Sequence, residues 1–494
     1  MATKNKKARS KAKSARYVVT SNVAGQQIDE RFVKSLLSYC KKKNAELKVL
    51  ELLPAIKGEE CSWDGVPESA RVGLEIKEIS LNNNCRIRQM YISPTSSDPS
   101  TGIALGTRET IIVGSPKQTY KSVANMERLP RAIISTGCIN KPAYAANKNG
   151  QMAHLNHMVG AYIVEVKDEN TFFPMNVQSL SDGSFIDRGI RYYPNGKVSK
   201  LSPEEIIRVD GDDHAAEIDP QISSLLDNIQ KNQVRVHCKV SHDTWSQRVS
   251  NHHNLGKHVL NARSMDSGFY KVEQEIELTR NFLNSKGSLY PSVVVVPSNH
   301  NEALGRMIEE ARYITEGQNW LSGTICSLAL YHGVDPVKFA TGYYAEFKES
   351  LSKFFASIHS DRLQEFKLSS KSALKNVRFL HDGQSFKFGG VELGYHGDDG
   401  ANGAKGSPKS MRQIHGNCVS GHTHVPALYN KSGTTGTSTH LPDHKDSPEY
   451  AKNKPSGWMN SFIFVYAPKD LNKNGTEGTL QLCNVVNYEW QVEK

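Results

Sequence analysis

The residues of this chain best suited to chemistry lie near its C-terminus, in the segment Gly421-His422-Thr423-His424. Because side chains alternate along an extended segment, we expect His422 and His424 to point the same way. Two imidazoles presented together from a strand end are a common way to hold a metal ion. Taken alone, a short histidine-rich segment is more often an exposed loop than a metal site, so the rest of the chain has to decide.

Four other short segments place metal-ligating side chains directly after apolar runs. In chain order they span residues 210–214, 241–243, 297–302 and 396–398. Apolar, β-branched runs that end in polar clusters are typical of strands whose carboxyl ends carry a site, as in open α/β sheets. Five such strand ends together predict one composite site.

The side chains in these segments are carboxylates, imidazoles and an amide, without a thiolate. This mixture of oxygen and nitrogen ligands suits manganese, iron or zinc. A carboxylate that bridges two ions would hold them about 3.5–4 Å apart. Two such cations would lower the pKa of a shared water and would also neutralise negative charge on a bound group.

The ordered motifs resemble the five signature blocks of the calcineurin-like metallophosphoesterase superfamily, over about residues 204–490. They are Asp212-x-His214, Asp243, Asn299-His300, His396 and Gly421-His422-x-His424. The resemblance implies two divalent metal ions, for which we expect Mn²⁺, with Fe²⁺, Zn²⁺ or Mg²⁺ as alternatives. It also implies the ligands: Asp212, His214 and His424 for the first ion, Asn299, His396 and His422 for the second, and Asp243 as the bridge.

Two residues next to these motifs differ from the family pattern. In the first motif, either His214 or Asp213 could be the residue that points inward. His242 and Ser298 stand where the family usually has glycine. Asp213 adds a carboxylate inside the first block, and if it pointed inward, His214 would not. None of these differences removes an expected ligand.

His300 follows a proposed ligand and is not itself a ligand in the family pattern. An imidazole can give a proton to a leaving alkoxide near neutral pH, so we assign His300 as general acid or transition-state stabiliser. The alternative is a histidine that only orients a neighbouring ligand. We expect His252 and His253, after the second block, to contact substrate phosphate, although surface histidines would explain them almost as well.

The first block from Gly211 to Pro220, together with the N-terminal half, resembles a narrower bacteriophage group. Its members include pre-early proteins that degrade host DNA. This resemblance implies a two-metal DNase that hydrolyses phosphodiester bonds with little sequence specificity, acting in the host cytoplasm during infection. DNA would then be the partner.

The formal charge of +10 is concentrated at the N-terminus, because residues 1–16 carry seven basic side chains and no acidic one. Such a segment cannot bury enough apolar surface to fold alone, so we predict a disordered arm. Its basic residues would neutralise DNA phosphates and give affinity without sequence choice. The tether would include Lys4, Lys6, Lys7 and Arg9. A tail that only aids solubility is the alternative.

The remaining composition predicts a cytoplasmic globular protein. No apolar run approaches the roughly 20 residues that cross a bilayer, and the N-terminus lacks the apolar stretch of a signal peptide. The eight cysteines are scattered without a Cys-x-x-Cys pair, so reduced thiols are expected. We expect no membrane partner, and a homo-oligomer is open.

The predicted fold class is α/β. Residues 17–52 read as strand, helix and strand, and we assign residues 17–195 to an N-terminal α/β accessory domain for substrate capture or subunit contact. Residues 196–494 would form a calcineurin-like metallophosphoesterase β-sandwich flanked by helices. Residues 1–16 would be the basic arm.

Three functions are the main alternatives, and a phosphoprotein phosphatase is a weaker fourth. The first is the DNase, which the basic arm favours because a small substrate needs no tether. The second is a small-substrate phosphodiesterase acting on a nucleotide or cyclic nucleotide, since the same metal chemistry serves both. The third is a catalytically inactive DNA-binding regulator, which the retention of every expected ligand argues against.

Overall fold

A computed structural model describes most of the chain, and its fold is mixed α/β. The described residues are 14–55, 58–125, 130–246, 248, 257–266, 271–349, 373–400, 406–448, 451–452, 454, 456–472 and 474–492. Lys4, Lys6, Lys7, Arg9, His252 and His253 lie outside these ranges. Among the described residues, no helix combines the length and apolar character that a membrane span requires.

The chain divides into two compact units, residues 1–199 with 483–494 and residues 200–482. The first unit begins with β1 (Ala15–Val23), α1 (Glu30–Lys43) and β2 (Glu46–Leu52). β1 and β2 are parallel, so the predicted strand, helix and strand are confirmed. Asp29 caps α1 by accepting hydrogen bonds from the backbone N–H groups of Arg31 and Phe32, and the apolar face of the helix is buried.

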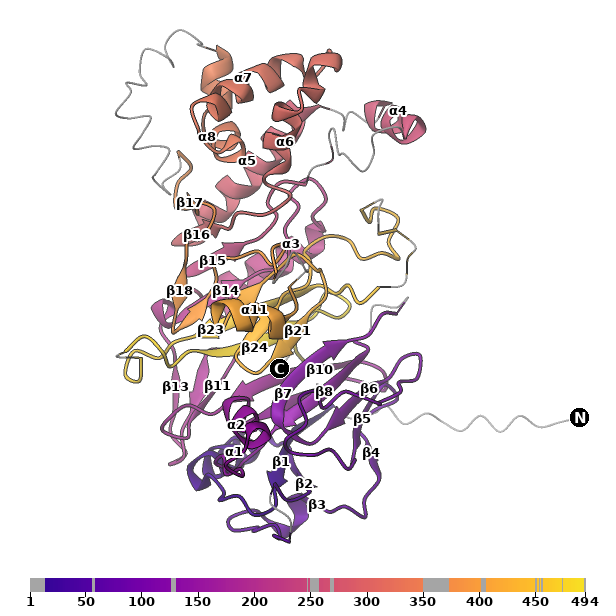
Figure 1. Cartoon of the computed structure of the whole chain (residues 1–494), viewed down its shortest axis with the longest axis vertical. Helices are drawn as coiled ribbons and strands as arrows, with labels where there is room; N and C mark the ends of the chain where they lie inside the picture. Colours follow the sequence, from indigo (N-terminus) through magenta and orange to yellow (C-terminus); the bar gives the residue numbers. More distant parts are fainter. Residues whose placement is uncertain are drawn as a thin grey trace, which may run out of the picture. The chain divides into compact units, whose positions relative to one another are not determined.

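Two large sheets and a three-stranded one lie in the first unit (Figure 1). The two large sheets are as follows. One has the order β10-β9-β1-β2-β3, completed by β3 (Arg71–Val72), β9 (Gly160–Val166) and β10 (Phe172–Gln178). In the other, β7, β8, β6, β5 and β4 follow one another. Their bounds are β4 (Glu78–Ser80), β5 (Cys85–Arg88), β6 (Thr110–Val113), β7 (Ser115–Ser122) and β8 (Ala132–Gly137). The unit also contains α2 (Lys148–Leu155), β11 (Phe185–Asp187), β12 (Ile190–Tyr192) and β13 (Val198–Lys200).

The end of the chain returns to the first unit. Lys167 Nζ lies 2.5 Å from Glu489 Oε2, and the backbone N–H of Val492 donates to Glu165 Oε2 at 3.1 Å. Val486 packs against Phe173 in a small apolar cluster. No pattern in the sequence predicts this return.

The second unit is built on a six-stranded sheet with the order β17-β16-β15-β14-β23-β24. The strands are β14 (Ile206–Val209), β15 (Cys238–Ser241), β16 (Ser292–Val295), β17 (Val377–Phe379), β23 (Ser461–Tyr466) and β24 (Thr479–Asn484). β14 to β17 are mutually parallel, whereas β23 runs antiparallel to β14. The carboxyl ends of β14, β15, β16 and β17 therefore meet at one edge, where polar side chains from distant segments can converge.

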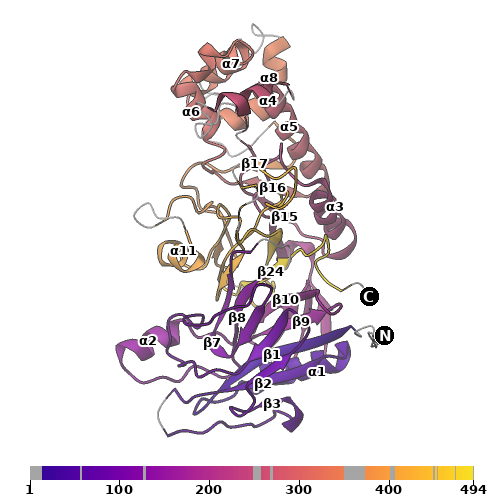
Figure 2. The same cartoon turned by 90° about the vertical axis from the view of Figure 1, so that its right-hand side faces the viewer.

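Helices and two small sheets complete the second unit. The views of Figures 1 and 2 agree that α5, α6, α7 and α8 gather together. The helices are α3 (Pro220–Asn228), α4 (His258–Asp266), α5 (Val272–Leu289), α6 (Ala303–Glu309), α7 (Trp320–Tyr331), α8 (Pro336–Glu349) and α11 (Pro408–His415). The small sheets pair β18 (Lys387–Phe388) with β19 (Val391–Glu392), and join β20 (Val419–Ser420), β22 (Ser432–Thr434) and β21 (Ala427–Tyr429).

Candidate metal centre

Each candidate ligand lies just beyond a strand of the second unit. Asp212 and His214 follow β14, Asp243 follows β15, and Asn299 follows β16. The remaining three come from the segments after β19 and β20, and they are His396, His422 and His424. These strands are largely buried and mostly apolar, although β14 contains Arg208 and β15 contains Lys239, and the candidate ligands begin where each strand ends.

Four of these residues adopt left-handed backbone conformations. The φ angles are 43° at His214, 45° at Asp243, 70° at His422 and 57° at His424. Non-glycine residues seldom occupy this region, and such strained positions concentrate at functional sites. The prediction that His422 and His424 lie on an extended segment is wrong. Thr423 N–H instead donates to Gly421 O at 2.9 Å, which bends the chain.

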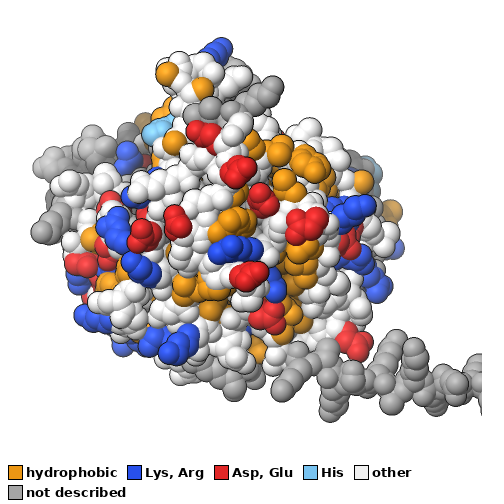
Figure 3. Space-filling view, turned by 90° about the horizontal axis from the view of Figure 1, so that it is seen from below, with side chains coloured by type: hydrophobic (Ala, Val, Ile, Leu, Met, Phe, Trp, Pro, Cys, Tyr) orange, Lys and Arg blue, Asp and Glu red, His pale blue; other side chains and the backbone are white. Residues whose placement is uncertain are grey.

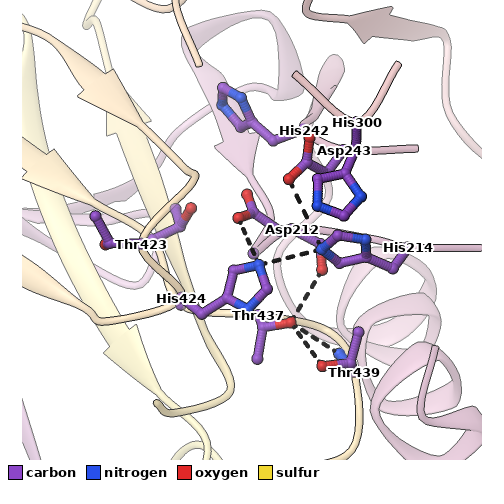
Figure 4. A network of polar contacts seen from close by, with 12 residues as sticks. Asp212, His214, His242, Asp243, His300, Thr423, His424, Thr437 and Thr439 are labelled. Carbon is purple, nitrogen blue, oxygen red and sulfur yellow. Dashed lines mark hydrogen bonds and ion pairs between the residues drawn. The ribbon is translucent and has the colours of Figure 1, made fainter. Parts of the chain in front are cut away.

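One group of side chains meets in a small buried volume (Figure 4). Ligand atoms of Asp212, His214, Asp243 and His424 all lie within 4.8 Å of one another. His424 Nε2 is 3.0 Å from Asp212 Oδ2 and 3.1 Å from His214 Nε2. Neighbouring ligands of one metal ion with bonds of about 2.0–2.2 Å have separations of this size.

A second group extends from the same aspartate. His396 Nε2 lies 3.1 Å from Asp243 Oδ2, and the rings of His396 and His422 have centroids 5.2 Å apart. Asp243 Oδ2 also lies 3.7 Å from His214 Nε2. One carboxylate oxygen therefore faces an imidazole of each group, which is the arrangement that a bridging ligand requires.

Several polar atoms at the centre are buried without a hydrogen-bond partner among the described residues. They include both carboxylate oxygens of Asp212, Oδ1 of Asp243, Oδ1 of Asn299, Nδ1 of His214 and Nε2 of His396. Buried polar groups are normally paired, and a bound ion is one explanation when they are not. The residues present therefore fit a group of divalent cations held by oxygen and nitrogen.

The electrostatics of the centre separate carboxylates that stay charged from imidazoles that stay neutral. Burial alone would raise the pKa of Asp243, but the surrounding histidines His396, His300 and His214 together outweigh burial and hold this pKa well below its ordinary value. Burial lowers the pKa of His422 to about 4, and that of His214 falls well below the ordinary value for the same reason. Charged carboxylates and neutral imidazoles are the forms that bind metals.

His396 behaves differently from these two histidines. Burial would lower its pKa, but the negative charges of Asp243 and Asp212 outweigh burial and raise the pKa to about 9. In the metal-free protein at neutral pH, His396 therefore carries a proton that a cation would have to displace.

The register of the first block follows from a buried charge network beneath the centre. Asp213 turns to Lys239 of β15, with Oδ2 2.8 Å from Nζ. Asp210 pairs with Arg208 at 2.5 Å and lies 3.3 Å from Lys239. With Asp210 and Asp213 engaged below, Asp212 and His214 are the residues of this block that face the centre.

His300 lies beside the first group rather than within it. Its ring centroid is 4.5 Å from that of His214, and its Nδ1 donates to the carbonyl oxygen of Ser246 at 3.1 Å. Burial lowers the pKa of His300, so in the free protein the imidazole is neutral near pH 7. Nδ1 then carries the proton, and Nε2 presents a lone pair.

Sequence reasoning missed residues that shape the centre. Thr437 Oγ1 donates to the backbone carbonyl of Asp212 at 3.2 Å, and the Trp458 ring lies 4.1 Å from that of His424. A Cβ atom on Gly421 would come within 2.1 Å of Asp212 Oδ1, so only glycine leaves this carboxylate room. No sequence signal marks Thr437 or Trp458, because both come from loops that only the fold brings to the site.

A second cluster, His440, His444 and Asp446, also brings ligand atoms within 4.8 Å of one another. Its two rings are nearly parallel, with an interplanar angle of 9° and centroids 4.1 Å apart. Imidazole lone pairs lie in the ring plane, so two stacked rings do not converge on one ion. Asp446 is mostly exposed, and the cluster makes a poorer cation site than the buried centre.

Comparison with known proteins places this chain beside a bacteriophage protein. It is 26% identical over 475 residues to Protein A1 of Escherichia phage T5, an alignment that covers 92% of this chain and 80% of that protein. No family model matches the chain. No solved structure matches it.

Proposed function

We propose that this chain is a metal-dependent hydrolase that cuts phosphodiester bonds of DNA during bacteriophage infection. The observation that carries the proposal is the position of Asp243 Oδ2, which faces His214 on one side and His396 on the other. A carboxylate oxygen so placed suits a pair of divalent cations, which is the arrangement used for in-line displacement at phosphorus. The resemblance of the motifs to the calcineurin-like metallophosphoesterase superfamily supports the same chemistry and the corresponding fold.

The side chains divide the work around this pair. Asp212, His214 and His424 would hold one cation, Asn299, His396 and His422 would hold the other, and Asp243 would contact both. When bound, the cations supply a nucleophile near neutral pH and neutralise charge on the phosphoryl group. The rigid strand ends keep the ligands in place, so little reorganisation is needed when the substrate binds.

His300 is the proposed proton donor to the leaving oxygen. In the free protein its pKa is lowered by burial. A phosphodiester brings a negative charge beside the imidazole, and that charge favours the protonated form. Its hydrogen bond to the carbonyl of Ser246 fixes the ring, so that Nε2 is the atom available to the substrate.

DNA is the proposed substrate on three grounds. The chain has a formal charge of +10, and its N-terminal residues are strongly basic. It is similar to a bacteriophage protein along most of its length. The motifs resemble phage proteins that degrade host DNA, which would act in the host cytoplasm. On the face drawn in Figure 3, lysine and arginine side chains form groups toward both sides, with acidic side chains among them, so this face adds no argument for DNA.

The test is digestion of plasmid and linear DNA by the full-length protein with Mn²⁺, Mg²⁺ or a chelator. We expect cleavage with Mn²⁺, none with chelator, and a loss of at least about a hundredfold in Asp243→Asn. Asp266→Asn is the matched control, because Asp266 is an exposed acid of the same unit. Hydrolysis of a small diester with intact DNA would indicate a small-substrate phosphodiesterase instead. Metal-independent DNA binding without turnover would indicate a regulator.

The role of the basic N-terminus is tested separately. Deletion of residues 1–13 should reduce the slope of log binding constant against log salt concentration, because each lost phosphate contact removes about 0.9 from that slope for duplex DNA. The measurement is fluorescence anisotropy of labelled DNA in chelator across a salt series. An unchanged slope would remove the tether from the proposal and leave the metal centre untouched.

A further inference from the structure

His242 is a fully buried histidine that the ligand set does not use. It follows β15 and directly precedes Asp243, at a position where the superfamily that the motifs resemble usually has glycine. A Cβ atom on Gly421 would lie 3.1 Å from Cβ and Cγ of His242, so the imidazole packs tightly against the turn that carries His422. A side chain of this size at the centre needs an explanation.

The contact that distinguishes His242 is with His396. Their Nδ1 atoms lie 3.3 Å apart, and the rings are tilted by 33°. Two ring nitrogens at this distance share one proton: one donates and the other accepts. Because His396 presents its other nitrogen, Nε2, to Asp243 Oδ2 at 3.1 Å, the direction of this hydrogen bond decides what His396 can do.

The two directions have opposite consequences for a cation. If Nδ1–H of His396 donates to His242, neutral His396 has its lone pair on Nε2 and can bind a cation next to Asp243. If His242 donates instead, neutral His396 carries its proton on Nε2 and can only hydrogen-bond to Asp243. In Figure 4 the His242 ring turns away from the carboxylates of Asp212 and Asp243, and its 3.3 Å contact with His396 makes it a partner of that ring.

We infer that His242 is a positioning residue, whose Nδ1 accepts the Nδ1–H of His396 and so keeps the Nε2 lone pair of His396 directed at the cation beside Asp243. The inference rests on the proposed metal centre. Metal-ligating histidines usually donate their second N–H to a carboxylate, a backbone carbonyl or water, and loss of that acceptor costs about 10–100-fold in metal affinity. In this chain the neutral imidazole of His242 would be the acceptor. The proton of the neutral His242 ring would then lie on Nε2, which makes no hydrogen bond among the described residues.

Two substitutions separate the roles that His242 can have. His242→Asn keeps an acceptor oxygen near the position of Nδ1, whereas His242→Leu keeps the volume and removes the acceptor. Mn²⁺ binding to the full-length proteins, measured by calorimetry, should show the weaker of two binding steps reduced by about 10–100-fold in the leucine variant. The asparagine variant should stay close to wild type. His332→Leu, at an exposed histidine of the same unit, is the control.

Each other result counts against the inference. Wild-type affinity in His242→Leu would show that the ring only fills space. Equal losses in the leucine and asparagine variants would show that Nε2 is itself a ligand. If His242→Leu does not fold by circular dichroism, His242→Ala replaces it with the same expectation. A wild-type chain that binds no Mn²⁺ would overturn the proposed function as well, whereas two bound ions with no effect of leucine would overturn the inference alone.

Discussion

At the scale of single residues, His396 links metal binding to pH. Its pKa is raised to about 9 because Asp243 and Asp212 favour the protonated imidazole, even though burial opposes it. A cation beside Asp243 must displace this proton, so affinity should fall as pH falls below 9. The expected slope is about tenfold per pH unit for one proton. His422, with a pKa of about 4, adds a second proton only in stronger acid.

This proton release is measurable without any substrate. Calorimetric titration of Mn²⁺ at pH 7, in two buffers with different protonation enthalpies, should give about one proton released per chain. His396→Gln should abolish the release together with one binding step. A buffer-independent binding enthalpy in the wild-type protein would contradict the account of His396.

Gly421 allows the segment that carries His422 and His424 to come close to Asp212. Because an added Cβ would lie 2.1 Å from Asp212 Oδ1, Gly421→Ala should displace that carboxylate. We expect Mn²⁺ affinity to fall by at least about tenfold with little change in the thermal unfolding temperature. Gly317→Ala, where a Cβ would meet nothing within 4 Å, is the control. Unchanged Mn²⁺ affinity in Gly421→Ala would show that Asp212 is not a ligand.

At the scale of elements, the ends of β14 and β15 are held by buried charges. Lys239 lies between Asp210 and Asp213, at 3.3 and 2.8 Å. Lys239→Met would leave Asp213 buried without its counter-charge, which should lower the free energy of unfolding by about 3–5 kcal/mol. Urea unfolding in chelator measures the loss. Lys231→Met, at an exposed lysine, should change little, and an equally small effect of Lys239→Met would show that Asp213 finds another partner.

The strand ends were predictable from the sequence, but the directions of their side chains were not. Val293 to Val296 are β-branched, the run before Asp210 is mostly so, and each run is followed by a polar cluster, which is a pattern that the local sequence alone displays. The expected alternation of side-chain directions does not hold at His422 and His424, because both residues have left-handed backbone conformations and the segment is not extended. It also left the choice between Asp213 and His214 open, since only the partner Lys239 on the neighbouring strand decides it.

Over the chain as a whole, the C-terminal residues 483–494 belong to the first unit, although they are far from it in sequence. Val486 is fully buried and packs with Phe173 and Met175. Val486→Ala should therefore lower the free energy of unfolding by about 1–3 kcal/mol. Calorimetry should show a lower unfolding temperature, whereas Val198→Ala, at a 38% exposed valine, should leave it unchanged. An unchanged temperature for Val486→Ala would mean that this return contributes little to stability.

Sequence patterns could not have predicted this closure. The last apolar run, Thr479–Leu482, predicts a strand. The residues after it carry no periodic pattern that indicates where they pack. Contacts such as Lys167 with Glu489 join positions far apart in the chain, and side-chain types alone do not select among many equivalent pairs. The mixed α/β character follows from local patterns, whereas the long-range contacts within each unit require the structure.

The central claim is that Asp243 joins two cations through one carboxylate. Electron paramagnetic resonance of the Mn²⁺-loaded full-length protein tests it most directly, because manganese ions that share a ligand are exchange-coupled. We expect a coupled spectrum in the wild-type protein that is lost in Asp243→Asn. A spectrum showing only the hyperfine pattern of isolated Mn²⁺, or no bound Mn²⁺ at all, would contradict the account.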